Sequence, residues 1–239
     1  MTDKLQFIKT PILSVIGVGE DSKKFIDEIK GWNSPLVSSM MLDRDFIVPE
    51  SGIELALLII TENVDATILA KNLKQSGLLT IIVATSEIRA MEGCYDSISK
   101  VSKDKVIDTV KTVADILMKP SRYICLDLND LLCVMKDSGT FRAFSHTSSV
   151  EKEGITNLVN YLREKLKGLP SLETMLVKIS LSDTGKELMK MEDLTILQKF
   201  FSTIPNNIRV LWSLDATENL ASDELAISII ATEPRTNKD

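Results

Sequence analysis

Two short and almost wholly apolar runs constrain the fold of this chain more than any other feature: residues 55–61 (LALLIIT) and 78–85 (LLTIIVAT). Apolar runs of this length, without polar alternation, predict strands that are buried on both faces of a sheet. Between them, residues 64–76 space their apolar side chains as one face of a helix does, and Gly77 follows where helices commonly end. The sequence therefore predicts a strand–helix–strand unit with parallel strands.

The same alternation of strand and helix extends over the first hundred residues. We predict a strand at 12–18, a helix at 22–30, and weaker strands at 36–42 and 95–101. Strands that alternate with helices form a parallel sheet with helices on its faces. Residues 1–101 are therefore expected to form a Rossmann-like α/β domain.

The middle of the chain, residues 102–139, is expected to carry the longest helix. Apolar positions recur at helical spacing over 103–119, and Pro120 ends the pattern. A short strand at 124–126 and a second helix over 128–138 are predicted to follow. This segment is expected to connect two domains.

Residues 140–239 have a different rhythm, in which strands and helices do not alternate strictly. The predicted elements are strands at 140–146, 175–181, 210–214 and 225–232, helices at 155–166 and 191–201, and a polar loop at 215–223. Such an order is typical of an α+β domain, in which helices pack on one face of a sheet. The expected architecture is an α/β Rossmann-like parallel-sheet domain, a long central helix and a smaller α+β domain.

The charge balance argues against a broad basic surface. The chain has 28 Lys and Arg residues against 34 Asp and Glu residues, a formal net charge of −6. The clearest cationic cluster, Arg163, Lys165 and Lys167, lies beside Glu164 on a predicted helix and is interpreted as a solvated face. Binding to a phosphate backbone depends on clustered Lys and Arg, so no nucleic-acid partner is expected.

Cysteine usage and the apolar runs indicate a cytoplasmic protein. Cys94, Cys125 and Cys133 lack paired zinc spacing and lie in or near apolar segments, so they are interpreted as buried, reduced thiols. The N-terminal stretch has an acid at position 3 and no long apolar core, unlike a signal peptide. The apolar runs are too short to span a bilayer, and no direct membrane contact is expected.

The sequence offers little else for catalysis or metal binding. His146 is the single histidine, which argues against multi-His metal sites and His-based catalytic constellations. It lies in an alternating stretch and is interpreted as a structural or surface residue. Gly185 and Lys186 share two letters with a phosphate-binding loop but lack its upstream glycine, and they are interpreted as a turn. We expect no metal site and no cofactor.

Three stretches together resemble FtsZ, the tubulin-like division GTPase. They are residues 119–135 (KPSRYICLDLNDLLCVM), 14–30 (SVIGVGEDSKKFIDEIK) and 223–232 (DELAISIIAT). The family carries a Lys/Arg-Pro pair after a long helix, then an Asn-x-Asp-x-x-Asp loop; its first turn is glycine-rich and its last strand ends in Ala-Thr. The resemblance covers most of the chain at low identity and implies a truncated FtsZ/tubulin-like fold.

Asp127 and Asp130 match the acids of the family's Asn-x-Asp-x-x-Asp loop. In FtsZ that loop enters the nucleotide pocket of the next subunit, where its acids help position the attacking water. This chain departs from the pattern at Cys125, where the family has Asn, and the spacing after Pro120 is longer. The residues alone allow a second, compatible reading, in which Asp127 caps the following helix and Asp130 stabilises its first turn.

Gly17 and Gly19 match the family's first phosphate turn, as a remnant of it. FtsZ places a run of glycines there, because backbone N–H groups must approach a phosphate at a helix N-terminus. Here Glu20 and Asp21 follow, and carboxylates oppose a bound anion. A structural interpretation is that Asp21 or Ser22 caps the next helix.

The family's second phosphate loop, a Gly/Thr-rich signature, has no counterpart in this sequence. No glycine lies between Gly52 and Gly77, and residues 62–65 (ENVD) add two acids after the strand at 55–61. The segment 31–53 is also short for the units that the family carries there. We therefore expect no bound nucleotide and no family-type GTPase activity.

Compared with FtsZ, the chain retains the acids of the Asn-x-Asp-x-x-Asp loop but lacks most glycines of the phosphate loops. This difference leads to the main hypothesis. The chain is expected to be a non-catalytic FtsZ-like protein in filament assembly or in the regulation of FtsZ and cell division, through longitudinal contacts with FtsZ-like proteins or with itself. Two alternatives stay open. One is self-assembly without nucleotide; the other is residual GTP binding, GTPase activity or the binding of another small ligand between residues 17–20, 61–63 and the central helix. The chain ends at Asp239 without the family's membrane-recruiting peptide, so membrane contact by that route is not expected.

Overall fold

A computed structural model describes residues 11–42, 52–88, 92–117, 126, 128–149, 154–169, 171–184 and 189–235. The chain divides into two compact units, Met1–Ile107 and Asp108–Asp239, and passes from one to the other within helix α3 (Val106–Leu117). The three-part division expected from the sequence stays a prediction. Within the described parts of the chain, no helix combines the length and the apolar content needed to cross a bilayer.

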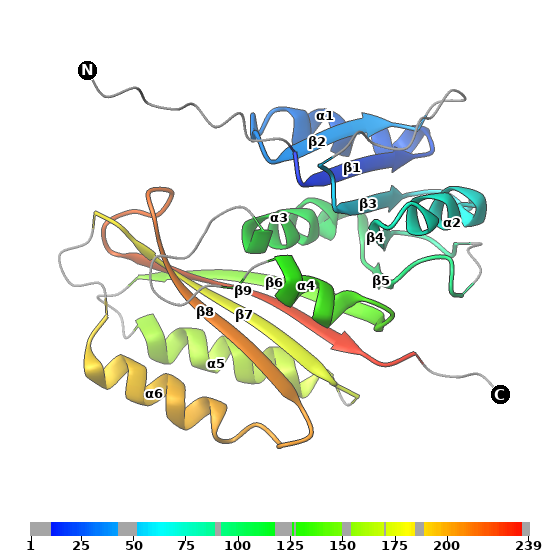
Figure 1. Ribbon diagram of the computed structural model, residues 1–239. Coiled ribbons are helices and arrows are strands. Elements are labelled where there is room, and N and C mark those ends of the chain that lie inside the picture. The colour runs from blue at the N-terminus through cyan, green and yellow to red at the C-terminus, as the bar shows by residue number, and fades with distance from the viewer. Residues whose placement is uncertain are drawn as a thin grey trace. The chain divides into compact units, whose positions relative to one another are not determined.

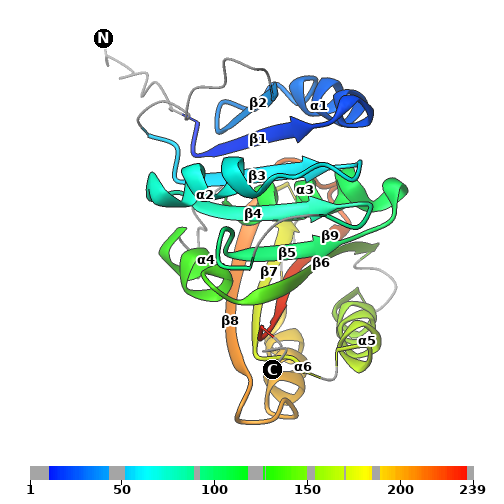
Figure 2. The same ribbon diagram turned by 90° about the vertical axis from the view of Figure 1, so that its right-hand side faces the viewer.

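The first unit is built on a five-stranded parallel sheet. Its elements are β1 (Leu13–Val18), η1 (Glu20–Ser22), α1 (Lys23–Lys30), β2 (Val37–Met41), β3 (Leu55–Ile60), α2 (Thr67–Gln75), β4 (Leu79–Ala84), β5 (Ser97–Lys100) and η2 (Lys103–Lys105), the two η elements being short 3₁₀ turns. The strand order is β2-β1-β3-β4-β5, and each neighbouring pair is parallel (Figure 2). Strands β1, β3 and β4 are buried at every residue, as their unbroken apolar runs predict.

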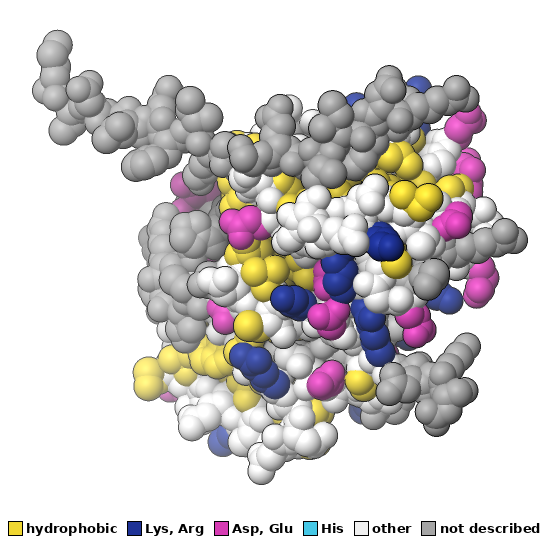
Figure 3. All heavy atoms as spheres, turned by 45° about the vertical axis from the view of Figure 1, so that its right-hand side comes forward, with side chains coloured by type: hydrophobic (Ala, Val, Ile, Leu, Met, Phe, Trp, Pro, Cys, Tyr) yellow, Lys and Arg dark blue, Asp and Glu magenta, His cyan; other side chains and the backbone are white. Residues whose placement is uncertain are grey.

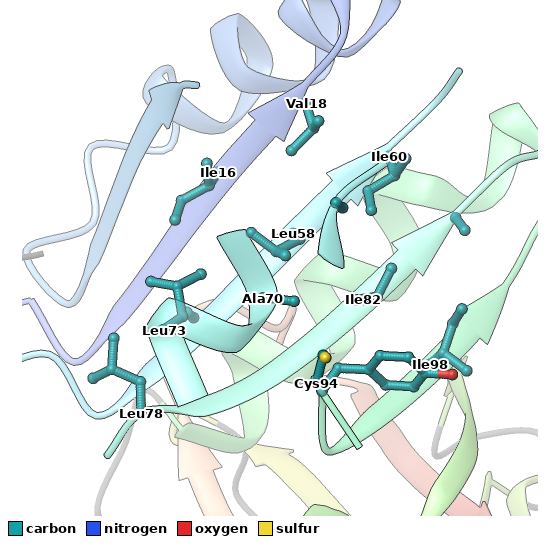
Figure 4. Close-up of a cluster of buried hydrophobic side chains, with 14 residues drawn as sticks. Ile16, Val18, Leu58, Ile60, Ala70, Leu73, Leu78, Ile82, Cys94 and Ile98 are labelled. Atoms are coloured by element: carbon teal, nitrogen blue, oxygen red, sulfur yellow. The ribbon is translucent and has the colours of Figure 1, made fainter. Parts of the chain in front are cut away.

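Helices α1 and α2 cover opposite faces of this sheet. Successive residues of a strand point to opposite faces. A Cβ atom on Gly17 would lie 2.7 Å from Ile26 of α1, so this face of β1 carries α1. Ile16, the preceding residue, belongs to the apolar cluster that Ala70 and Leu73 of α2 fill from the other side (Figure 4). Helices on both faces make this a doubly wound α/β unit.

The second unit is a four-stranded mixed sheet with two helices packed on one face. Its elements are α4 (Leu128–Met135), β6 (Gly139–Ser149), α5 (Gly154–Lys167), β7 (Thr174–Ser182), α6 (Met191–Phe201), β8 (Arg209–Thr217) and β9 (Glu224–Glu233). In the order β6-β9-β7-β8, strand β9 is antiparallel to both of its neighbours, and β8 is parallel to β7 (Figure 1). Alternate apolar residues of β7, β8 and β9 pack against α5 and α6 in one cluster, as the α+β pattern predicts.

The opposite face of the second sheet carries a buried ion pair. Lys178 Nζ lies 3.6 Å from Asp215 Oδ2, and the two side chains are only 6% and 1% exposed. The same ammonium donates a hydrogen bond of 2.7 Å to the carbonyl oxygen of Asp115, near the end of α3. Lys178 therefore joins β7, β8 and the last turns of α3. A charge this deeply buried is tolerated only when it is paired.

Several predicted bounds agree closely with the structure, and the deviations have local causes. Helix α6 coincides with the prediction at 191–201. Helix α2 begins at Thr67 rather than at residue 64, because the Asp65 carboxylate accepts the Thr67 N–H at 2.9 Å and starts the helix there. It ends, as predicted, before Gly77, which has a left-handed φ of +86°.

The middle of the chain deviates more. The helix predicted for 103–119 begins as the 3₁₀ turn η2 and continues as α3, and residues 118–119 lie outside the described residues. The strand predicted at 124–126 is not observed at Leu126, and its other two residues are also outside the described ones. Gly185 and Lys186 lie outside them too.

Two further predictions are wrong. Residues 215–217, predicted as part of a polar loop, extend β8, where they pair with the end of β7. Cys133, predicted to be buried, is exposed, because α4 turns Val134 and Met135 toward the core instead. Cys94 is buried as predicted, and Cys125 lies outside the described residues.

Charges of both signs mix on the face that Figure 3 shows. There the Lys and Arg side chains are interspersed with Asp and Glu side chains. Neighbouring charges of opposite sign cancel at a distance, so they produce only short-range fields. The mixing agrees with a chain in which acids modestly outnumber bases.

Candidate functional site

The first unit has a strand order that directs ligands to one edge of the sheet. The chain continues from β1 to β2 on one side and then returns to β3 on the other side of β1. In open sheets of order 2-1-3-4-5, the direction reverses between strands 1 and 3, and ligands bind outside the carboxyl ends of these strands. The predicted phosphate turn, with Gly17 and Gly19, lies at the end of β1, and Glu62 follows β3.

Gly17 is required by packing inside the unit. A Cβ atom at this position would lie 2.7 Å from a side-chain atom of each of three residues, Ile26, Met41 and Ser22. Glycine in a strand commonly marks a place where other chain segments come very close. The close approach of α1 and β2 to β1 therefore accounts for Gly17 without a ligand.

A carboxylate of the same unit lies against the turn. Glu62 Oε1 accepts a hydrogen bond of 3.0 Å from the backbone N–H of Asp21. A Cβ atom on Gly19, whose φ is +88°, would lie 3.0 Å from the carboxyl carbon of Glu62. Backbone N–H groups at the start of a helix attract anions, and here a residue 41 positions away supplies one. The turn thus holds an internal anion.

The helix cap predicted at this turn is wrong. Ser22 is the N-cap residue of α1 but makes no side-chain cap, and its hydroxyl donates a hydrogen bond to the Gly19 carbonyl oxygen at 2.5 Å. Asp21 also does not cap the helix; its carboxylate lies 2.7 Å from Lys103 Nζ. The hydrogen bond from Lys103, and then its positive charge, lower the pKa of Asp21. Distant partners have replaced the local caps that the sequence suggested.

Two hydroxyl groups lie at the carboxyl ends of neighbouring strands. Thr61 directly follows β3 and is 5% exposed, and Ser86 lies two residues beyond β4. Among the described residues, neither side-chain oxygen has a hydrogen-bond partner. Buried hydroxyls normally have one. A water or a small polar ligand at this edge would satisfy them.

Lys103 is a site residue that the sequence does not reveal, since its pattern indicates only the start of a helix. Glu62 falls within residues 61–63 of the alternative ligand site, but the sequence does not indicate that its carboxylate contacts the turn. Both follow the carboxyl end of a parallel strand, β3 and β5 respectively. Because those ends lie at one edge of a sheet, their position is the signal that would have grouped them with the turn.

The structure is similar to solved structures of known proteins, although no sequence match was found. No protein-family model and no curated protein sequence matches the chain. An FtsZ dimer from M. jannaschii superposes with a TM-score of 0.67 at 15% identity, over 95% of this chain and 89% of that one. A GDP-form protofilament of TubZ from Bacillus thuringiensis serovar israelensis gives 0.64 at 8% identity, over 93% and 85%. A helical model of a two-stranded TubZ-Bt filament gives 0.68 at 8% identity, over 94% and 86%.

The chain has the FtsZ and TubZ fold. The predicted fold class, a Rossmann-like parallel sheet followed by a long helix and an α+β part, is thereby confirmed. Sequence identities of 8% and 15% support a shared fold only. Any ligand binding or catalysis by this chain has to be argued from its own residues.

The acidic segment that matches FtsZ leads into α4 of the second unit. Asp130 lies in the first turn of α4 and is half-buried, whereas Asp127 lies outside the described residues. An acid in the first turn of a helix is favourable whatever else it does. A role of Asp127 and Asp130 toward a partner stays a prediction.

His146 makes a contact between strand and helix. It lies on β6, and its ring stacks on Tyr161 of α5 with the centroids 4.5 Å apart. The Tyr161 hydroxyl donates a hydrogen bond of 3.1 Å to the carbonyl oxygen of Ser145. Burial, and then the negative charge of Asp108, raise the pKa of Tyr161. This arrangement agrees with the interpretation of His146 as a structural residue.

Proposed function

We propose that this chain is a cytoskeletal protein of the FtsZ and TubZ fold that builds or modulates filaments without binding GTP. The fold supports the first half of the proposal, because solved structures of that fold include a dimer, a protofilament and a two-stranded filament. The chemistry of the β1 turn supports the second half.

The observation that carries the proposal is the carboxylate of Glu62 on the Asp21 N–H. A phosphate placed at the same turn would meet this carboxylate and the exposed acids Glu20 and Asp21. Two like unit charges about 4 Å apart repel by roughly 1–4 kcal/mol at the effective dielectric of water or of a protein surface. Several such contacts oppose the binding of a triphosphate at this turn.

Assembly is proposed to use contacts in which no nucleotide takes part. The segment with Asp127 and Asp130, which matches FtsZ, is the part of the second unit that we expect to contact a neighbouring subunit. The neighbour is a second copy of this chain or a subunit of an FtsZ-like filament. Modulation of FtsZ, and with it a role in cell division, belongs to the second of these cases.

The test is sedimentation combined with electron microscopy of the purified chain. We expect filaments or large oligomers in buffer with EDTA and no nucleotide, and no change in their mass when GTP is added. Replacing both acids, Asp127→Asn and Asp130→Asn, should reduce the pelleted fraction. Asp27→Asn, a matched change at an exposed position of α1, should leave it unchanged.

Pre-formed FtsZ filaments extend this test to a heterologous partner. If the chain co-sediments with them or changes their GTP turnover, it acts as a modulator. A chain that stays monomeric at high concentration, and that neither pellets with FtsZ nor alters its turnover, would contradict the proposal.

A second candidate function is the binding of a small polar ligand at the same edge of the first sheet. The hydroxyls of Thr61 and Ser86, which lack partners among the described residues, favour it. Nucleotide and phosphate titrations separate this function from assembly, since a ligand-dependent protein would bind in solution whether or not it forms polymers.

A further inference from the structure

A hollow in the second unit lies where two helices end. It has a volume of about 480 Å³ and is formed by the last turn of α5, the connection from α5 to β7, the end of α6 and the connection from α6 to β8. The lining residues described are Arg163, Leu166, Lys167, Leu169, Leu172, Phe200, Thr203, Ile204, Pro205, Asn207 and Ile208. This volume is within the roughly 300–1,000 Å³ typical of pockets that hold small ligands.

The lining of the hollow is mainly apolar. Leu166, Leu172, Phe200 and Ile204 contribute side chains from both helix ends and from the connections after them. The backbone of the turn after α6 is internally bonded: the N–H of Thr203 donates to the Phe200 carbonyl oxygen at 2.9 Å. A guest would therefore meet aliphatic and aromatic surface rather than unsatisfied backbone groups.

Two cations lie in the lining of this apolar hollow. Arg163 and Lys167 are four residues apart on α5, so they project from the same side of the helix. The guanidinium of Arg163 lies over the ring of Phe200, 5.7 Å from its centroid. Lys165, the third member of the cationic cluster noted in the sequence, lies instead over Phe144, at 5.4 Å. The cluster therefore divides between two surroundings.

The present partners of Arg163 and Lys167 leave both side chains available to an anionic ligand. Lys167 Nζ is 2.6 Å from Glu164 Oε1, but both side chains are about 70% exposed, at 71% and 69%, and an exposed pair of this kind adds little stability. Arg163 Nη1 reaches Asn160 Oδ1 only at 3.5 Å. Basic residues near the end of α5 are explained by their favourable interaction with the helix C-terminus. That interaction does not explain why Arg163 and Lys167 both line an apolar hollow.

We infer that this hollow binds a small amphipathic anion, a molecule with an apolar body and one carboxylate or sulfonate group. The apolar body fits against Leu172, Phe200 and Ile204, and the anionic group pairs with Arg163 and Lys167. A charge-assisted hydrogen bond from a guanidinium is the strongest polar contact that this lining offers. All of the described lining of the hollow lies in the second unit, and the turn at β1 contributes nothing to it.

The experiment compares two ligands that differ mainly in charge, decanoate and decan-1-ol. Binding to the full-length chain is measured by calorimetry below the micellar concentration of decanoate, and amide chemical shifts locate the site. We expect decanoate to bind at least about tenfold more tightly than the alcohol, as one well-placed charged contact provides. Shift changes should centre on the ends of α5 and α6.

Three variants sharpen the test. Arg163→Gln combined with Lys167→Gln should remove the preference for the acid, and Asn207→Trp should weaken both ligands by filling the hollow. Lys71→Gln, at an exposed position of α2, is the matched control and should change neither. Equal affinity for acid and alcohol, shifts that centre elsewhere, or binding of an acidic apolar peptide without binding of decanoate would overturn the assignment.

Discussion

The two units place their charges differently. In the first, the three central strands β1, β3 and β4 are apolar or small almost throughout, and Asp21, Glu62 and Lys103 lie in turns beyond the carboxyl ends of strands. A buried carboxylate of this unit, Asp96, directly precedes β5 and pairs with the partly exposed Lys74 at 3.0 Å. In the second, Lys178 and Asp215 form an ion pair inside the sheet. Polar residues at the ends of strands can be replaced without loss of the core. An ion pair within the sheet cannot be broken without a large loss of stability.

The largest expected effect follows from breaking the ion pair of the second unit. Lys178→Met leaves the Asp215 carboxylate buried without its cation, which typically costs about 3–5 kcal/mol in the free energy of unfolding. Urea denaturation measures the loss. Lys178→Met combined with Asp215→Leu should recover much of it, because an apolar pair of similar volume has no charge to desolvate.

The exposed pair of the first unit provides the comparison. Lys103→Met removes the partner of Asp21, but both side chains are more than half exposed, at 54% and 53%, so its effect on unfolding should be far smaller. If Lys178→Met and Lys103→Met destabilised the chain equally, the contrast between the units would be lost.

The next largest change in the free energy of unfolding is expected from the apolar core of the first unit. Ile82 of β4 is fully buried in the cluster beside α2 (Figure 4). Ile82→Val should lower the free energy of unfolding by about 0.5–1.5 kcal/mol, since it deletes one buried methyl-sized group. The same change at Ile68, which is 75% exposed on α2, should leave the unfolding midpoint within error.

A smaller loss is expected when the internal anion is removed. Glu62→Ala takes away the acceptor of the Asp21 N–H, so we expect a loss of about 0.5–1 kcal/mol, at the low end of the effect of losing a helix cap. The Asp21 amide resonance should shift strongly. Glu87→Ala, at an exposed glutamate beyond β4, is the control and should move neither quantity.

The smallest effect is a shift in one titration. Lys103 lowers the pKa of Asp21 below its ordinary value of 3.8, so ionised Asp21 favours the folded state above that pH. This contribution disappears as the pH falls through the lowered pKa. Carboxyl chemical shifts should place the titration below 3.8 in the natural chain and closer to it in Lys103→Met. An unchanged pKa in the variant would contradict the pairing.

The sequence predicted what local pattern controls. Strands β3 and β4 were recognisable because burial on both faces requires an unbroken apolar run. The helix at 191–201 was recognisable because burial along one side requires apolar residues at helical spacing. Asp21 instead pairs with Lys103, 82 residues away, and its N–H with Glu62. Nothing in a local window distinguishes these partners from the nearby Ser22, whose predicted capping role was wrong. Long-range pairing of polar groups had to be read from the structure.

Glu62 occupies the anion position at the β1 turn, and we propose that this turn therefore accepts no nucleotide. Calorimetric titration of the full-length chain with GDP and GTP in the presence of Mg²⁺ tests it most directly. We expect no saturable heat, which corresponds to a dissociation constant weaker than about 1 mM. Micromolar binding of either nucleotide, accompanied by shifts of the Gly19 and Asp21 amide resonances, would contradict the claim.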